Sequence, residues 1–133
     1  MHNIALFFPC CDNQCWEPGT NYLKRRYHRV FVLGRPAVNK ILAERRDVIR
    51  VQAIRADIED IINLDRFDIT VVIGGHCPCA RNPGDQEEQE GHLRQAAETI
   101  KSFGLGVKIG LLLMTEDGNA QEVPLERFVP AST

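Results

Sequence analysis

The stretch Ile69-Thr70-Val71-Val72-Ile73-Gly74-Gly75-His76-Cys77-Pro78-Cys79 joins an apolar run to a turn that is rich in potential metal ligands. The run 69–73 lacks polar alternation, which is typical of a strand buried on both faces. A second segment has the same form, because Ile4-Ala5-Leu6-Phe7-Phe8 leads directly into Pro9-Cys10-Cys11-Asp12-Asn13-Gln14-Cys15. Together the two turns hold all five cysteines of the chain. Thiolates and an imidazole at neighbouring strand ends predict a zinc site, because zinc takes sulfur and nitrogen ligands in tetrahedral geometry.

The remaining elements are predicted from apolar content and spacing. The expected strands are rich in β-branched and aromatic residues and cover residues 4–8, 28–33, 48–51, 69–73, 107–114 and 121–123. The expected helices carry apolar residues at helical spacing and cover residues 37–46, 57–62 and 86–103. We expect a polar loop around Pro18-Gly19. A turn at Asp117-Gly118-Asn119 makes 121–123 the hairpin partner of the preceding strand.

This alternation of strands and helices predicts the α/β class, with a mostly parallel central sheet that helices cover on both faces. In such sheets, binding sites form beyond the carboxyl ends of the strands, near the point where the strand order reverses. Both cysteine-bearing segments follow the carboxyl end of a predicted strand. The predicted fold therefore places the candidate ligands where a site is expected.

Length and composition are those of one globular domain over residues 1–133. The chain is 44% hydrophobic and 26% charged with a formal net charge of −2, so nucleic-acid binding is not expected. No apolar run approaches the length of a membrane span or a signal peptide, and we expect a cytoplasmic protein. Thiols stay reduced in that compartment, so five grouped cysteines favour a metal or redox site over a disulfide framework.

Two alternatives to a metal site involve the same cysteines. The first is that they are small buried hydrophobic side chains, which their grouping in two strand-end turns argues against. The second is a thiol redox protein that uses Cys77 and Cys79, or Cys10 and Cys11 against Cys15. The sequence lacks the Cys-x-x-Cys spacing of thioredoxin-like motifs, but the redox alternative stays open.

The two segments also resemble the zinc motifs of one enzyme family. Cys10-Cys11-Asp12 matches a Cys-x-Asp motif, and Gly75-His76-Cys77-Pro78-Cys79 matches a Gly-His-x-x-Cys motif. In this order, each after its strand, they resemble the β-class carbonic anhydrases. Residues 107–118 and 122–123 are similar to the closing strand and hairpin of that family. The chain is shorter than typical members and looks like a compact, divergent, carbonic-anhydrase-like branch.

The resemblance implies the β-carbonic-anhydrase fold and a zinc ion held by Cys10, His76 and Cys79. It implies a lyase that hydrates carbon dioxide reversibly to bicarbonate by zinc-bound hydroxide, acting as a homodimer or a larger homo-oligomer. It assigns Asp12 the role of the catalytic carboxylate, which either orients the zinc-bound water or takes the fourth zinc position. The other cysteines have no counterpart in the motifs; they are Cys11, Cys15 and Cys77. Cys11 is an alternative to Cys10 as the zinc ligand, because the two are adjacent in the chain.

One departure from the family pattern bears on catalysis. The family motif continues to an arginine that pairs with the aspartate, and this position is Gln14 here. Glutamine cannot form the charged, bidentate pair that draws a carboxylate away from the metal. If Asp12 then closes the zinc site as a fourth ligand, the protein is a catalytically silent zinc-binding protein. Another arginine of the chain would replace the missing one if the fold brought it close to Asp12. The candidates lie near predicted strand ends or near the turn that contains His76; they are Arg35, Arg50 and Arg81.

Overall fold

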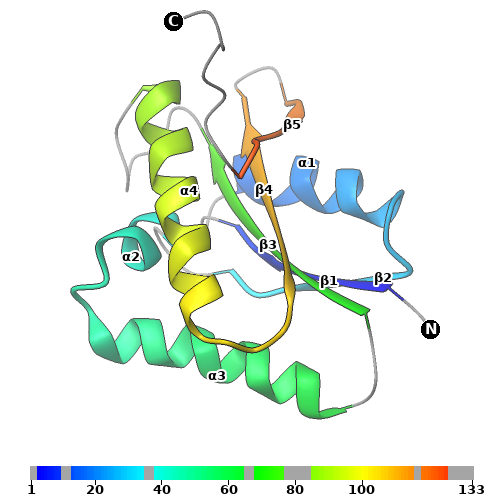
Figure 1. Cartoon of the computed structure of the whole chain (residues 1–133). Coiled ribbons are helices and arrows are strands. Elements are labelled where there is room, and N and C mark those ends of the chain that lie inside the picture. The colour runs from blue at the N-terminus through cyan, green and yellow to red at the C-terminus, as the bar shows by residue number, and fades with distance from the viewer. Residues whose placement is uncertain are drawn as a thin grey trace, which may run out of the picture.

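The sheet at the centre of the fold has five strands in the order β2-β1-β3-β4-β5 (Figure 1). A computed structural model of the chain describes residues 3–9, 13–34, 38–64, 68–76, 85–115 and 118–125, with the backbone alone for residues 13–15 and 76. The strands are β1 (Asn3–Phe8), β2 (Arg29–Val32), β3 (Asp68–His76), β4 (Lys108–Met114) and β5 (Ala120–Glu122). The first four are parallel and β5 is antiparallel to β4, which confirms the predicted mostly parallel sheet and its closing hairpin.

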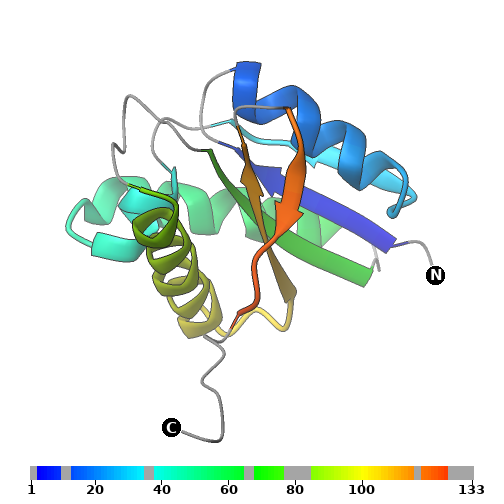
Figure 2. The same ribbon diagram turned by 90° about the horizontal axis from the view of Figure 1, so that it is seen from above.

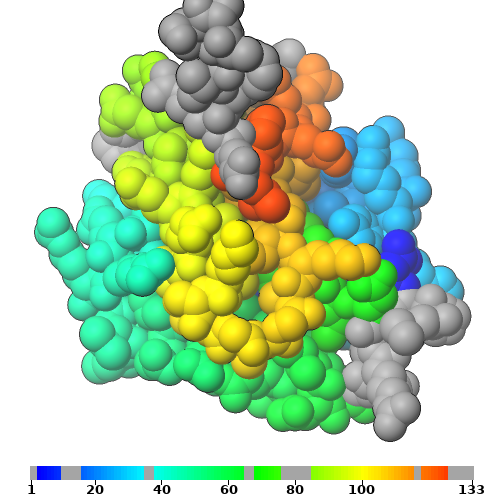
Figure 3. Space-filling view, in the orientation of Figure 1, coloured from blue at the N-terminus to red at the C-terminus, as the bar shows by residue number. Residues whose placement is uncertain are grey.

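Helices cover both faces of this sheet (Figure 2). One face is covered by α1 (Asn13–Lys24), and the other by α2 (Val38–Glu44), α3 (Val48–Leu64) and α4 (Gln86–Ser102). In the space-filling view, the surfaces of these last helices adjoin one another (Figure 3). Each face has its own buried apolar cluster, and the cluster under α1 is the smaller. The predicted α/β class, with helices on both faces, is confirmed.

The expected polar loop around Pro18-Gly19 is wrong, because both residues lie in α1. Pro18 lies in the second turn, where its missing N–H removes one helical hydrogen bond. Packing outweighs that loss, because Gly19 and Leu23 are one turn apart and both are buried. Within the helix, the Thr20 hydroxyl also donates to the Trp16 carbonyl at 2.7 Å.

The expected strand 48–51 is also wrong, since it is the first turn of α3, and the expected helix 57–62 is part of the same long helix. Two of the β-branched residues that suggested a strand face solvent, because Val48 and Ile49 are 63% and 83% exposed. The residues of α3 that reach the core have helical spacing; they are Val51, Ile54 and Ile58. The other expected helices and strands are present with slightly different bounds.

The pairing of β1 with β3 decides where the cysteine-bearing segments begin. The chain passes from β1 to β2 on one side and returns as β3 on the other, so the strand order reverses between β1 and β3. Phe8, the last residue of β1, is paired with Ile73 in parallel register. The carboxyl ends of both strands therefore lie at the same edge of the sheet, which we call the carboxyl edge.

Phe7 fills the space between α1 and β3 near the carboxyl edge. Its side chain is fully buried and lies against two glycines. A Cβ atom added to Gly19 would lie 2.3 Å from Phe7 Cζ, and one added to Gly74 would lie 2.7 Å from Phe7 Cε1. Met114 of β4 also borders this space, with its Cε 3.0 Å from the added atom at Gly74. The absence of a side chain at both glycines is thus what lets the phenyl ring fit.

Replacing Gly19 with alanine is expected to lower the free energy of unfolding by about 1 to 2 kcal/mol, because the overpacking cost exceeds the gain in helix propensity. The matched control is Gly91→Ala, which also lies inside a helix but where an added Cβ would meet nothing within 4 Å. That control is expected to gain about 0.5 to 1 kcal/mol. Urea unfolding measures both changes, and equal effects would contradict the packing role of Gly19.

Candidate metal site

The two predicted zinc motifs start at the carboxyl edge. β1 ends at Phe8 and is followed by Pro9, while β3 extends through Gly74-Gly75 to His76. His76 is the last residue of β3, and its Cα partner on β4 is Met114. The backbone of one predicted zinc ligand therefore lies at the edge where the fold places a site.

The other predicted site residues lie outside the part of the chain that the structure describes. These are the ligands Cys10 and Cys79, the carboxylate Asp12, and the further cysteines Cys11 and Cys77. Gln14 and Cys15 lie in the first turn of α1, where only the backbone is described. Among the described side chains, no three His, Cys, Asp or Glu residues form a group that would hold a metal ion. The ligand assignment thus stays a prediction from the sequence.

Of the arginines considered as partners for Asp12, Arg50 is the one that the structure describes. It lies in the first turn of α3, where its backbone N–H donates to Asp47 Oδ1 at 3.1 Å. Its side chain continues this contact, with Nε 3.3 Å from Asp47 Oδ2, and both side chains are largely exposed. Arg50 therefore belongs to the capped start of a surface helix. Arg35 and Arg81 lie outside the described residues.

A buried pair of amide side chains lies directly behind the end of β3. Asn39 of α2 donates from Nδ2 to Oε1 of Gln89 of α4 at 3.0 Å, and both side chains are fully buried. The Lys40 N–H donates to Asn39 Oδ1 at 3.0 Å and so orients this amide. A Cβ added to Gly75 would lie 3.1 Å from Asn39 Nδ2 and 3.3 Å from Gln89 Oε1. The amide pair therefore packs against the residue that precedes His76.

Sequence reasoning missed this pair, although the helix patterns held a signal for it. Gln89 stands at the start of the buried stripe of α4, which continues through Leu93, Ala96, Ala97 and Ile100. Asn39 occupies a buried position of α2 beside Val38 and Leu42. A polar residue in an apolar stripe is unusual, because burying an amide costs free energy unless it is hydrogen-bonded. That Asn39 of α2 is the hydrogen-bond partner of Gln89 of α4 follows only from the three-dimensional structure.

Residues 1–124 match the sequence profile of a protein family described as "Putative carbonic anhydrase". The chain belongs to this family. The matched range contains both cysteine-bearing segments and every helix and strand of the described residues. No curated protein and no solved structure matches the chain.

The residues at the carboxyl edge fit the zinc ion that the family resemblance implies. Two thiolates and one imidazole are a donor set that zinc favours. Cys10 follows the end of β1 by two residues, and Cys79 follows His76 by three. Segments of that length span at most about 7 and 10 Å even when fully extended, so the sequence spacing does not prevent the three ligands from sharing one ion. The spacing and the ligand types are therefore compatible with one shared metal ion.

Gln89→Leu is expected to lower the free energy of unfolding by about 1 to 3 kcal/mol, because it removes the acceptor of a buried amide donor. Leucine has a similar volume, so the change removes the hydrogen bond without opening a large cavity. Gln95→Leu is the matched control, since Gln95 is exposed on the same helix and its loss is expected to cost less than about 0.5 kcal/mol. Urea unfolding compares the two, and an equal loss would contradict a specific role for the amide pair.

Proposed function

We propose that the protein is a zinc-dependent carbonic-anhydrase-like enzyme that catalyses the reversible hydration of carbon dioxide to bicarbonate. In this proposal Cys10, His76 and Cys79 hold the zinc ion, and Asp12 is the carboxylate that acts at the fourth position. The observation that carries the proposal is the parallel pairing of β1 and β3, which starts both ligand-bearing segments at one edge. Membership of a carbonic-anhydrase-like family supports the choice of reaction.

Zinc, when bound, acts as a Lewis acid that lowers the pKa of water toward neutrality and so makes hydroxide available for attack on carbon dioxide. The residues of the chain have separate tasks. Cys10, His76 and Cys79 would hold the ion. Asp12, if it is held away from the metal, accepts a hydrogen bond and orients the attacking oxygen. The amide pair behind Gly75 fixes the backbone of the strand that ends in His76.

A catalytically silent zinc-binding protein is the alternative, with Asp12 as a fourth ligand. Gln14 favours this alternative, because a neutral amide does not compete with zinc for the carboxylate as an arginine does. Arg50, the one described candidate for that arginine, contacts Asp47 instead. A thiol redox protein is the third possibility and requires that the cysteines bind no metal. The following experiments separate the three proposals.

Protein purified without chelators under reducing conditions is expected to hold about one zinc ion per chain, measured by elemental analysis. His76→Ala and Cys79→Ser are each expected to lose most of the bound zinc, because a tetrahedral site that lacks a ligand loses affinity. Cys15→Ser is the matched control and is expected to keep its zinc, since Cys15 has no counterpart in the zinc motifs.

X-ray absorption on the same samples identifies the ligand atoms. We expect the zinc ion to be coordinated by sulfur, nitrogen and oxygen atoms. Three sulfurs without oxygen would contradict the assignment and bring in Cys11, Cys15 or Cys77. A zinc-free protein with free thiols throughout would overturn the metal site and favour the redox alternative.

The residue at position 14 separates an active enzyme from a silent zinc protein. We expect the zinc-loaded wild type to hydrate carbon dioxide in a stopped-flow assay with a pH indicator. Gln14→Arg is then expected to change the rate by less than about tenfold, because the site is already open. Gln14→Lys is the control, since lysine adds charge without a bidentate pair. An inactive wild type that gains activity only with arginine would establish the closed site.

The family resemblance also supports a homodimer or a larger homo-oligomer. The proposal includes a cytoplasmic location, where thiols stay reduced. A net charge of −2 favours a small-molecule substrate over a nucleic-acid partner. None of the helices in the described ranges combines the length and the apolar content needed to cross a membrane. Sedimentation of the purified protein measures the oligomeric state directly.

A further inference from the structure

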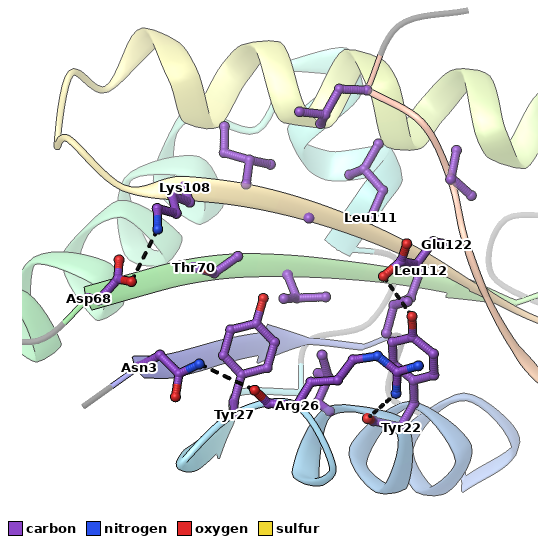
Figure 4. A pocket seen from close by; sticks show the side chains of 16 residues that line it. Asn3, Tyr22, Arg26, Tyr27, Asp68, Thr70, Lys108, Leu111, Leu112 and Glu122 are labelled. Carbon is purple, nitrogen blue, oxygen red and sulfur yellow. Dashed lines mark hydrogen bonds and ion pairs between the residues drawn. The ribbon is translucent and has the colours of Figure 1, made fainter. Parts of the chain in front are cut away.

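A groove of about 460 Å³ runs along β4, away from the carboxyl edge, and its lining comes from both faces of the sheet (Figure 4). On the α1 face, β3 and β4 form its floor with Thr70, Val72, Gly110 and Leu112. On the other face, Ile109, Leu111 and Val123 border it. The last turn of α1 and the residues after it form the wall. The volume falls in the range of about 300 to 1,000 Å³ that is typical of small-molecule sites.

Two polar contacts close the ends of the groove, and Figure 4 shows Tyr27 between them. At one end, the Tyr22 hydroxyl donates to Glu122 Oε1 of β5 at 2.6 Å. At the other end, Lys108 Nζ lies 3.1 Å from Asp68 Oδ2. Burial and the nearby Glu122 raise the pKa of Tyr22, so its phenol stays neutral and keeps donating at neutral pH. One end of the groove thus holds an ion pair, and the other holds a carboxylate that accepts a hydrogen bond from a neutral phenol.

Gly110 is what makes the floor hollow. It is paired with Val72 across β3 and β4, so the two residues face the same side of the sheet. A Cβ added to Gly110 would touch only Val72 Cγ2 at 3.6 Å and Thr70 Cγ2 at 3.8 Å, which are ordinary contacts. Unlike Gly74, Gly110 therefore does not make room for a neighbouring side chain of the core, and the space above it stays open.

Arg26 supplies a cation at the wall whose charge no carboxylate neutralises. Its guanidinium carbon lies 3.6 Å from the centroid of the Tyr22 ring, and Nη1 donates to the Tyr22 carbonyl at 3.1 Å. Asn3 holds the backbone beside it, because Asn3 Nδ2 donates to the Arg26 carbonyl at 3.2 Å. Within the described part of the chain, no acidic side chain lies within 4.0 Å of this guanidinium. The cation is thus held in place and remains able to meet an anion.

We propose that the groove binds a small organic anion, whose apolar or aromatic body lies over Val72 and Gly110 and whose charged group meets Arg26. An apolar floor bordered by a few fixed polar groups is the usual form of such sites. Bicarbonate is too small and too polar to fill an apolar floor, so this ligand differs from the product of the proposed reaction. The groove shares none of its lining residues with the predicted zinc ligands, so the proposal is independent of the metal.

The test is a fluorescence titration of the full-length protein with two matched probes. Anilinonaphthalene sulfonate is an aromatic anion, and phenylnaphthylamine has the same ring system without the sulfonate. Arg26→Gln is expected to weaken binding of the anion about tenfold or more, because a charge-assisted contact is lost. Binding of the uncharged probe is expected to stay within about twofold, since the apolar floor remains. Arg25→Gln is the control, because Arg25 is exposed and does not line the groove.

Gly110→Leu provides the second variant, which fills the groove from its floor. It is expected to abolish binding of both probes while the far-ultraviolet circular dichroism and melting temperature stay at or above wild type. Unchanged anion binding in Arg26→Gln or in Gly110→Leu would overturn the proposal. So would a wild type that binds neither probe and forms a dimer that Gly110→Leu converts to monomer, because a second copy would then occupy the groove.

Discussion

The parallel pairing of β1 with β3 is the constraint on which the rest of the structure depends. It sets the point where the strand order reverses and brings both cysteine-bearing segments to one edge. The end of β3 is then packed from both faces. Phe7 lies against Gly74 on the α1 side, and the buried amide pair lies against Gly75 on the other. Such support from neighbouring side chains is what a precise ligand site requires of its scaffold.

The strands were predictable from the sequence because β1 and β3 are apolar runs buried on both faces, and such runs carry their signal locally. The helices at Pro18-Gly19 and 48–51 were not, because local propensity there favours a turn and a strand while distant packing decides otherwise. For the candidate site, the strand ends that precede the ligands were predictable, whereas the ligand assignment stays a prediction from the sequence. The buried amides were not predictable, because Asn39 and Gln89 meet across two helices that are far apart in sequence.

The two faces of the sheet differ in the helices that pack on them. In the part of the chain that the structure describes, three helices cover one face and α1 covers the other. Near the end of α1, Thr70, Val72 and Gly110 of β3 and β4 line the groove, and the missing side chain at Gly110 makes it deeper. The same helix begins at Asn13, inside the first cysteine-bearing segment, and ends two residues before Arg26, so it adjoins both candidate sites.

The contacts of Phe7 join three positions that are distant in sequence into one shared volume. Positions 7, 19 and 74 belong to different elements, and an interior packed to crystal-like density has no spare room for a larger side chain at any of them. An alanine at 19 or 74 is then compatible only with a smaller side chain at 7. Related chains should therefore vary at these positions in concert. Such covariation would reveal the approach of α1 to β3 from aligned sequences alone.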